Sequence, residues 1–166
     1  MREIKNNQRG FTLVELLLYT VIAAGLLLSI TTLISLLIQS RVKNQTMSTV
    51  EQQGTQVLQI ISQEIRNAKL VSSPTLGNTT SNLQLQNQNN ESIIISLSSS
   101  TLYYSKSGQV ITLTPLNIEV DNFSVTNLGP DQHNSLKLQF DLKNKNLSGR
   151  SEYNYNQTFY GTANLR

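Results

Sequence analysis

The sequence predicts an α+β protein in which one long N-terminal helix packs on a C-terminal antiparallel β-sheet head. After a short charged leader, an almost unbroken apolar run is followed by a segment with apolar residues at every third or fourth position, which is typical of helices. After Gly77 the apolar residues alternate with a period of two, which is typical of half-buried strands. A length of 166 residues leaves room for one domain and an anchor.

The leader, residues 1–10, is short and charged. It holds three basic side chains (Arg2, Lys5 and Arg9) and one acidic side chain, Glu3. The whole chain has a formal net charge of +3, so a chain without the leader is nearly neutral. The high isoelectric point is therefore no argument for binding nucleic acid.

Residues 11–38 form an apolar segment that we expect to be a transmembrane or filament-core helix. About 28 residues make a helix of roughly 42 Å, which exceeds a hydrocarbon core of about 30 Å. The segment runs into Arg41 and Lys43 without a small-x-small cleavage site, which argues against a secretory signal peptide. Basic residues flank both ends, so the positive-inside rule gives little preference for either orientation.

Glu15 is the one carboxylate inside this apolar segment. An ionisable side chain at the centre of a membrane helix costs about 2.5 to 3.5 kcal/mol on insertion scales, so Glu15 is a candidate functional residue. The simpler interpretation is a signal anchor with a stray acidic residue near its end.

The stretch Arg9–Leu18, RGFTLVELLL, resembles the class III signal of type IV pilins and type II secretion pseudopilins. This resemblance implies that a prepilin peptidase cleaves between Gly10 and Phe11 and methylates the new N-terminal amine of Phe11. It also implies that Glu15 is the assembly carboxylate, which pairs with the free N-terminus of a neighbouring subunit.

The resemblance also implies the partners and the location of the protein. The partners are the prepilin peptidase, other pilin or pseudopilin subunits bound through their N-terminal helices, and the inner-membrane assembly platform. Before assembly the chain is a single-pass protein of the bacterial inner membrane, in contact with the lipid bilayer and with its head outside the cytoplasm. Afterwards it is part of a pilus or pseudopilus.

Polar and small residues within the apolar segment leave two interpretations open. They are tolerated in a membrane helix, because hydroxyls bond to the carbonyls of their own helix. Alternatively, small residues such as Ala23, Ala24 and Gly25 permit close helix packing in a filament core. Thr32 stands where many major pilins have a proline, so the resemblance gives no basis for expecting a kink or a melted turn there and leaves the question open.

An amphipathic helix is expected to follow at residues 39–70, with its pattern running from about residue 40 to Lys69. Its apolar stripe is expected to pack against the head, and Pro74 and Gly77 are expected to end the helix. The stripe comprises Met47, Val50, Gly54, Val57, Ile61, Ile65 and Ala68, with Leu58 beside it. The segment Gln63–Ala68 resembles the corresponding helix end of larger minor pilins and pseudopilins, which favours a minor over a major subunit.

Residues 75–166 are expected to form the β-rich head, with six or seven strands in one antiparallel sheet against the helix. Ser105–Gly108 has the composition of a hairpin turn. The chain has no cysteine, so packing against the helix replaces disulfides in stabilising the head. The expected strands are centred on residues 83–85, 93–95, 102–104, 110–113, 118–125, 136–142 and 153–160.

No catalytic residue, metal site or cofactor is predicted. With no cysteine and one histidine, His133, a Cys-His pair and a histidine metal cluster are excluded. Composition leaves a Ser-His-Asp triad open, but no nucleophile-elbow pattern is present, and a solvated loop histidine is favoured. Asp121, Asp131 and Asp141 lack the close spacing of a calcium loop, although some pseudopilins bind calcium, so the resemblance leaves a calcium site open.

The function that these observations favour is that of a structural subunit, not an enzyme. The alternative is an uncleaved single-pass membrane protein that presents a β-rich binding head. A basic group near Tyr153 and Tyr155 makes DNA binding conceivable, but a solvated charged turn is the favoured interpretation. The group comprises Lys137, Lys143, Lys145 and Arg150.

Overall fold

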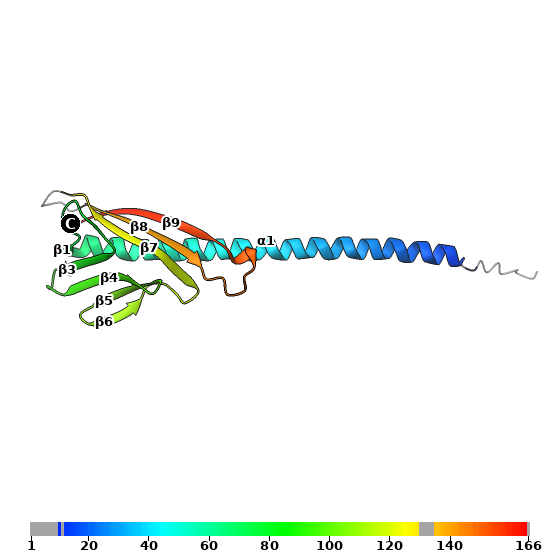
Figure 1. Cartoon of the computed structure of the whole chain (residues 1–166), viewed down its shortest axis with the longest axis horizontal. Helices are drawn as coiled ribbons and strands as arrows, with labels where there is room; N and C mark the ends of the chain where they lie inside the picture. Colours follow the sequence, from blue (N-terminus) through cyan, green and yellow to red (C-terminus); the bar gives the residue numbers. More distant parts are fainter. Residues whose placement is uncertain (1–9, 11, 130–134, 166) are drawn as a thin grey trace, which may run out of the picture. The chain divides into compact units, whose positions relative to one another are not determined.

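The structure is a computed structural model that describes residues 10, 12–129 and 135–165. The chain divides into two compact units, residues 1–41 and 42–166, which we treat separately. Helix α1 (Leu13–Asn67) has 55 residues and is followed by nine strands within the described residues (Figure 1). The predicted α+β class, one long helix followed by antiparallel strands, is confirmed.

The part of α1 in the first unit is apolar and exposed. Its most apolar window has a mean hydropathy of 2.5, and none of that window is buried inside the protein. By length and composition, α1 is therefore able to cross a membrane. The helix continues without interruption through Thr32.

The hydroxyl groups of this apolar part bond to the backbone of their own helix. Ser29 Oγ donates to the Gly25 carbonyl at 2.9 Å, and Thr32 Oγ1 donates to the Ser29 carbonyl at 2.8 Å. Thr20, Thr31 and Ser35 do the same. Each of these hydroxyl donors is thus satisfied without water, which lets the residues lie in an apolar segment.

In the second unit one stripe of α1 is buried, as the sequence predicts from Val50 to Ile65, but Thr46 is buried in place of the predicted Met47, which is half-buried. The buried residues are spaced three or four apart, which keeps them on one face of a helix. They are Thr46, Val50, Gly54, Val57, Ile61 and Ile65. The prediction that this helix reaches Lys69 is wrong, because α1 ends at Asn67 and strand β1 (Ala68–Ser73) begins at once. The backbone groups of β1 form hydrogen bonds with strand β3 (Asn82–Asn87). A helix that continued through these residues would not form these bonds.

The head contains two antiparallel sheets, where the sequence predicts one. The first has the order β1-β3-β4-β5-β6 and the second the order β2-β7-β8-β9. The remaining strands are β2 (Thr79–Thr80), β4 (Ser92–Ser98), β5 (Thr101–Lys106), β6 (Gln109–Thr112), β7 (Ile118–Asn127), β8 (Ser135–Asn144) and β9 (Asn156–Asn164).

The division between the sheets falls between β6 and β7. All four residues of β6 are exposed, and Pro115 follows soon after, where a missing N–H prevents continued pairing. The chain then enters the second sheet with β7. A backbone hydrogen bond of 2.9 Å from Val120 N to Ser100 O links the two sheets at this point.

Strands β7 and β8 show how alternation in the sequence specifies the core. In β8 every second residue from Leu136 to Leu142 is buried. In β7 the buried apolar residues are Ile118 and Val120, and then Phe123 and Val125, so the alternation moves by one residue between Val120 and Phe123. A register shift between Val120 and Asn122 restores the apolar side chains to the core face.

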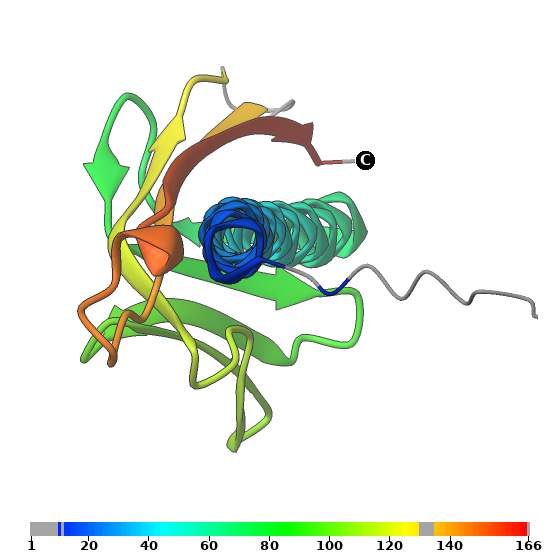
Figure 2. The ribbon, with the colours of Figure 1, turned by 90° about the vertical axis from the view of Figure 1, so that its right-hand side faces the viewer.

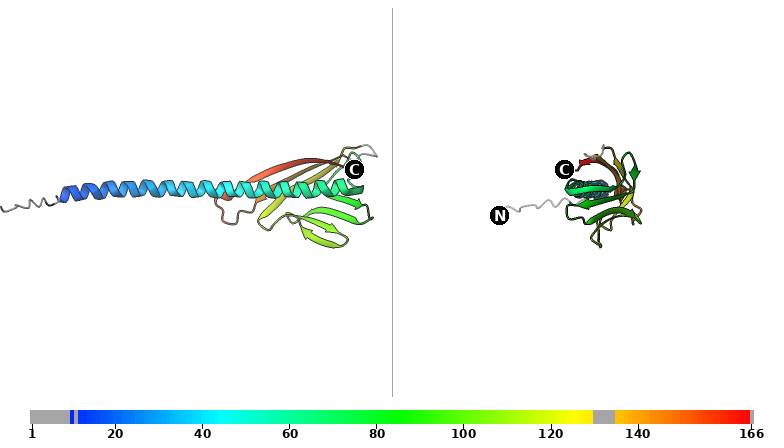
Figure 3. Two further views of the ribbon diagram at one scale, coloured as in Figure 1. Left: turned by 180° about the vertical axis from the view of Figure 1, so that it is seen from behind. Right: turned by 90° about the vertical axis from the view of Figure 1, so that its left-hand side faces the viewer.

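The two sheets lie around one side of α1. Figure 2, a view along the helix, shows β9 curving over it and strands of the first sheet on another side. The left view of Figure 3 shows the opposite side of the helix, which no strand covers. The apolar stripe of α1 therefore completes the core of both sheets, together with residues such as Leu83, Ile95, Phe123 and Phe140.

The last strand begins later than the sequence predicts. Residues 153–160 are expected to be a strand, but Ser151–Tyr153 form the 3-10 turn η1, and β9 runs from Asn156 to Asn164. Hydrogen bonds from Tyr153 N to Arg150 O (3.2 Å) and from Asn154 N to Ser151 O (3.1 Å) close this turn.

Candidate functional site

The candidate site is the start of α1, where the sequence analysis places Gly10, Phe11 and Glu15. Gly10 is exposed and precedes the first helical residue, Leu13. A Cβ atom added to Gly10 would meet no other atom within 4 Å. Phe11 lies outside the described residues. Gly10 itself is therefore outside the helix and accessible.

Thr12 caps the N-terminus of α1. Its Oγ1 accepts a hydrogen bond from Glu15 N at 3.3 Å, and its carbonyl accepts one from Leu16 N at 3.2 Å. This is the geometry of an N-cap residue, which gives a partner to an otherwise unpaired helix N–H. Cleavage after Gly10 would leave this cap intact, because Thr12 remains in the shortened chain.

The sequence analysis assigned no role to Thr12, although a signal for one is present. Threonine followed three residues later by glutamate is the capping-box pattern, which marks helix starts. Residues 12–15 read Thr-Leu-Val-Glu and fit it. The same glutamate that is a candidate for assembly thus also belongs to the helix start.

Glu15 is partly exposed and lies in the first turn of α1. Tyr19 Oη donates a hydrogen bond to Glu15 Oε1 at 3.5 Å, across one helical turn. A negative charge in the first turn is favourable, because the helix dipole is positive at this end. Glu15 therefore places an anionic group in the first helical turn. After cleavage, this turn would lie close in sequence to the new N-terminal amine.

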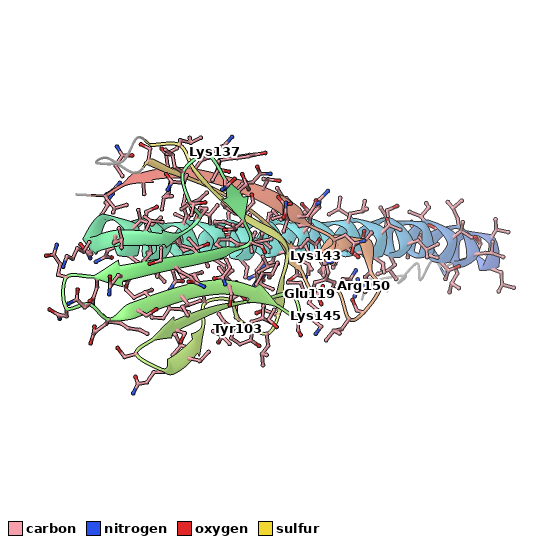
Figure 4. The ribbon with its side chains drawn as sticks, turned by 60° about the vertical axis from the view of Figure 1, so that its left-hand side comes forward. Tyr103, Glu119, Lys137, Lys143, Lys145 and Arg150 are labelled. Carbon is pink, nitrogen blue, oxygen red and sulfur yellow. The ribbon has the colours of Figure 1, made fainter. Side chains whose placement is uncertain are left out.

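The basic residues of the head lie in ion pairs. Lys143 Nζ is 2.7 Å from Asp121 Oδ1 and 3.5 Å from Glu119 Oε2. Lys145 Nζ is 3.9 Å from Glu119 Oε1. The hydrogen bond to Asp121 raises the pKa of Lys143 above its usual value. Figure 4 shows Glu119 among these lysines, at one end of the head.

Arg150 and Lys137 complete the comparison with the predicted basic group. Arg150 pairs with Glu152 at 3.1 Å, and Figure 4 places it near Lys143 and Lys145. Lys137 lies apart from them, on the part of β8 that pairs with Thr162 of β9. All four residues thus lie on the hairpin of β8 and β9, but Lys137 is separate from the cluster that the other three form. Neutralisation of the other three by acidic neighbours gives no support to DNA binding.

The part of the chain that the structure describes offers no group of side chains for a metal ion. Within those residues no cluster of three or more His, Cys, Asp or Glu side chains is placed to hold a metal ion. Asp121 is engaged with Lys143. His133 and Asp131 lie outside the described residues, so the structure leaves their predicted roles as they stand.

Tyr155, one of the two tyrosines near the predicted basic group, bonds to the helix. Tyr155 Oη is 3.2 Å from Glu51 Oε1 of α1 and also bonds to Gln157. Burial, and then the hydrogen bond to Glu51, raises the pKa of Tyr155. Tyr155 thus connects β9 to the helix and does not present a free stacking surface beside the lysines.

A groove of about 870 Å³ runs between α1 and the end of β9. Its lining includes Gln59, Gln63, Arg66 and Asn164, so one charged side chain stands among amides. It lacks the combination of apolar walls and convergent polar groups that is typical of small-molecule sites.

Comparison with known families gives one match. A family model described as the prokaryotic N-terminal methylation motif matches residues 5–36, which include Gly10, Glu15 and most of the apolar segment. Comparisons of the chain with curated proteins and with solved structures found no match.

Proposed function

We propose that this chain, which carries the N-terminal methylation signal of type IV pilins and pseudopilins, is processed after Gly10 and becomes a structural subunit of a pilus or pseudopilus. The observation that carries this proposal is the motif match over residues 5–36, on a chain whose apolar helix begins two residues after Phe11. The proposal extends that signal to peptidase processing, membrane anchoring and assembly.

In the processing step, the prepilin peptidase hydrolyses the bond between Gly10 and Phe11 and adds a methyl group to the amine of Phe11. The exposure of Gly10 and its lack of close neighbours support access to this bond. The cap supplied by Thr12 keeps the helix start intact after the leader is lost.

In the membrane stage, residues 11–38 span the bacterial inner membrane and the head lies outside the cytoplasm. The apolar exposed surface of this part of α1 supports a lipid-facing role. The hydroxyls bonded to their own helix support it further, since they need no water.

In the assembly step, Glu15 pairs with the Phe11 amine of a neighbouring subunit. An isolated carboxylate in a low-dielectric environment is strongly disfavoured, and an opposite charge recovers much of this cost. Glu15 Oε1 accepts a long hydrogen bond of 3.5 Å from Tyr19 Oη, and a charge-assisted bond to an amine is shorter and stronger than such a contact. The pair would fix the axial register of one helix against the next.

Within this class we propose a minor subunit without enzymatic activity. The head has two sheets and a resemblance to the larger minor forms at Gln63–Ala68, and Thr32 replaces the proline of many major pilins. Its partners would be the prepilin peptidase, other subunits and the inner-membrane assembly platform.

The test is co-expression of the full chain with a prepilin peptidase, followed by measurement of the N-terminus and the intact mass of the membrane-extracted product. Loss of residues 1–10 with one added methyl group on Phe11 is the expected result. An intact N-terminus, under conditions in which the same peptidase cleaves a control precursor, would contradict the proposal. It would favour the alternative, an uncleaved membrane protein with a binding head.

A further inference from the structure

Two leucines at one end of the head are exposed far beyond its other apolar residues. Leu116, between β6 and β7, is 95% exposed, and Leu147, between β8 and η1, is 87% exposed. No other large hydrophobic side chain among the described residues of the second unit exceeds 62%. Transfer of these two side chains from water to an apolar environment would therefore gain free energy.

The two loops that carry these leucines are joined. Lys145 N donates a hydrogen bond to Asn117 O at 2.9 Å. Asn117 directly follows Leu116, and Lys145 lies two residues before Leu147. Glu119 adds a long ion pair to Lys145 at 3.9 Å. The leucines therefore extend from a connected surface, which we call the double-loop end and define as residues 113–117 and 145–150.

The double-loop end lies beside the first residues of α1 that belong to the head. Val42 and Thr46 line a hollow of about 280 Å³ together with Asn117, Asn144 and Tyr153. Figure 1 shows these loops, coloured yellow-green and orange, at the end of the head opposite to β1. Both loops thus belong to the end of the head at which the helix enters it.

Chain connectivity limits how far Val42 can lie from the apolar segment. The segment ends at Ile38, four residues before Val42, and four residues span at most about 14 Å even when fully extended. Val42 therefore stays within that reach of the apolar segment, whatever angle the two units adopt.

We propose that, before assembly, Leu116 and Leu147 insert into the headgroup boundary of the lipid bilayer and hold the head against the membrane surface. This inference rests on the membrane stage of the proposed function. Leucines that enter this boundary gain an apolar environment, while Lys145 and Arg150 beside them can keep their charged groups among the lipid headgroups.

A lipid surface fits the double-loop end better than a protein partner does. A stable protein interface buries about 800 Å² on each partner in a closely packed patch. Two leucines on neighbouring loops supply two points of insertion without such a continuous face. A bilayer accepts separate side chains, and it is the environment that the adjacent apolar segment of α1 is suited to.

The test uses the full chain reconstituted into vesicles of neutral and anionic phospholipid. Since the chain contains no cysteine, Ser148→Cys gives a single labelling position in the loop of Leu147, for a dye whose emission reports polarity. The emission of the label is measured in three proteins. The first keeps all leucines, the second carries Leu116→Ser with Leu147→Ser, and the third carries Leu76→Ser with Leu128→Ser. The last pair is the matched control, because these leucines are exposed by 52% and 57% and lie away from the double-loop end.

The expected result is a shift of emission to shorter wavelength and quenching by lipid-attached quenchers. Both effects should be lost in the Leu116 and Leu147 variant and kept in the control variant. Equal emission from all three proteins would overturn the inference. Loss of the shift on dilution of the protein in excess lipid would also overturn it, because the contact would then be with a second copy.

A second label at Ile34→Cys separates this inference from the proposed function. If it is quenched by lipid while the label at position 148 remains in water, membrane anchoring stands and insertion of the loops is wrong. If the label at position 34 is also in water, membrane anchoring is wrong and the inference falls with it.

Discussion

Gly54 of α1 lies directly against the ring of Phe159 in β9, so closely that a Cβ atom on Gly54 would overlap the ring. One turn further along, the relationship is reversed: a Cβ atom on Gly161 of β9 would come within 2.5 Å of Leu58 Cδ1. Phe159 also stacks on Phe140 at 5.4 Å, which limits its freedom to move away. These two glycines allow the helix and the strand to approach each other.

Gly54→Ala is therefore expected to destabilise the head. Overpacking costs about 1 to 3 kcal/mol, whereas alanine in a helix gains only about 0.5 to 1 kcal/mol over glycine. The net expected change is a loss of about 1 kcal/mol or more in the free energy of unfolding. Denaturant unfolding of the full chain in detergent, followed by near-ultraviolet circular dichroism, measures it.

Gly25→Ala is the matched control, since an added Cβ atom there meets nothing within 4 Å. The double variant Gly54→Ala with Phe159→Leu should lose less stability than the sum of the two single variants, because the smaller side chain at position 159 relieves the overlap. Equal stability of Gly54→Ala and Gly25→Ala would contradict the packing argument.

Glu15→Gln tests the assembly carboxylate. This variant keeps the shape of the side chain but removes its charge, so cleavage and membrane insertion should be unchanged while incorporation into filaments falls. Loss of one partner of a buried ion pair costs about 3 to 5 kcal/mol, or on the order of 100-fold or more in equilibrium. Competition between tagged wild-type and variant subunits in one cell measures the ratio incorporated.

Thr12→Val provides the structural comparison for Glu15. It removes the hydroxyl cap of the same helix turn, at a cost of about 1 kcal/mol, and leaves the carboxylate in place. If Thr12→Val lowers incorporation as much as Glu15→Gln does, the effect comes from the helix start and not from the charge.

The sequence predicted those parts of the fold in which the spacing of apolar residues matches the face that is buried. The stripe on α1 and the alternation of Leu136–Leu142 in β8 each mark one buried face, and both are confirmed. The first strand was missed because Ala68–Ser73 directly follows the helix, with no glycine or proline between them. The division into two sheets was missed because which strands pair depends on contacts distant in sequence.

The candidate site shows a similar division. Gly10, Phe11 and Glu15 could be identified because their motif is contiguous in sequence, and the family model matches the same stretch. Leu116 and Leu147 could not, since exposure is a property of the folded loops and an isolated leucine in a sequence more often indicates a core. Lys137 is separate from the rest of the predicted basic group for the same reason: neighbours in sequence are not always neighbours in space.

Gly10→Ala is expected to reduce cleavage by the prepilin peptidase without altering the structure. The added methyl group meets no atom of the protein, so any loss of processing comes from the peptidase and not from the fold. The processed fraction after co-expression should fall by about tenfold, the effect of a single missing contact of about 1.4 kcal/mol. Gly25→Ala, which lies outside the cleavage region, should be processed like the wild type; equal processing of Gly10→Ala would contradict a role for this glycine.

Tyr104 of β5 should make the stability of the head sensitive to alkaline pH. Its hydroxyl donates a hydrogen bond to Glu64 Oε1 of α1 at 3.2 Å. Burial, and then the nearby Glu64 carboxylate, raises the pKa of Tyr104 to about 12, from 10.0. Below pH 10 the hydroxyl is protonated in both the folded and the unfolded state, so its contribution to stability is fully present.

Between pH 10 and about 12 the unfolded state loses this proton first, so the free energy of unfolding should fall as the pH rises. In Tyr104→Phe this fall should be smaller, and stability at neutral pH should be lower by about 1 kcal/mol for the lost hydrogen bond. Unfolding of the full chain in detergent at a series of pH values measures both, with Tyr160→Phe as the control because that side chain is 62% exposed. An unchanged pH dependence in Tyr104→Phe would show that Tyr104 and its contact with Glu64 do not cause the loss of stability at alkaline pH.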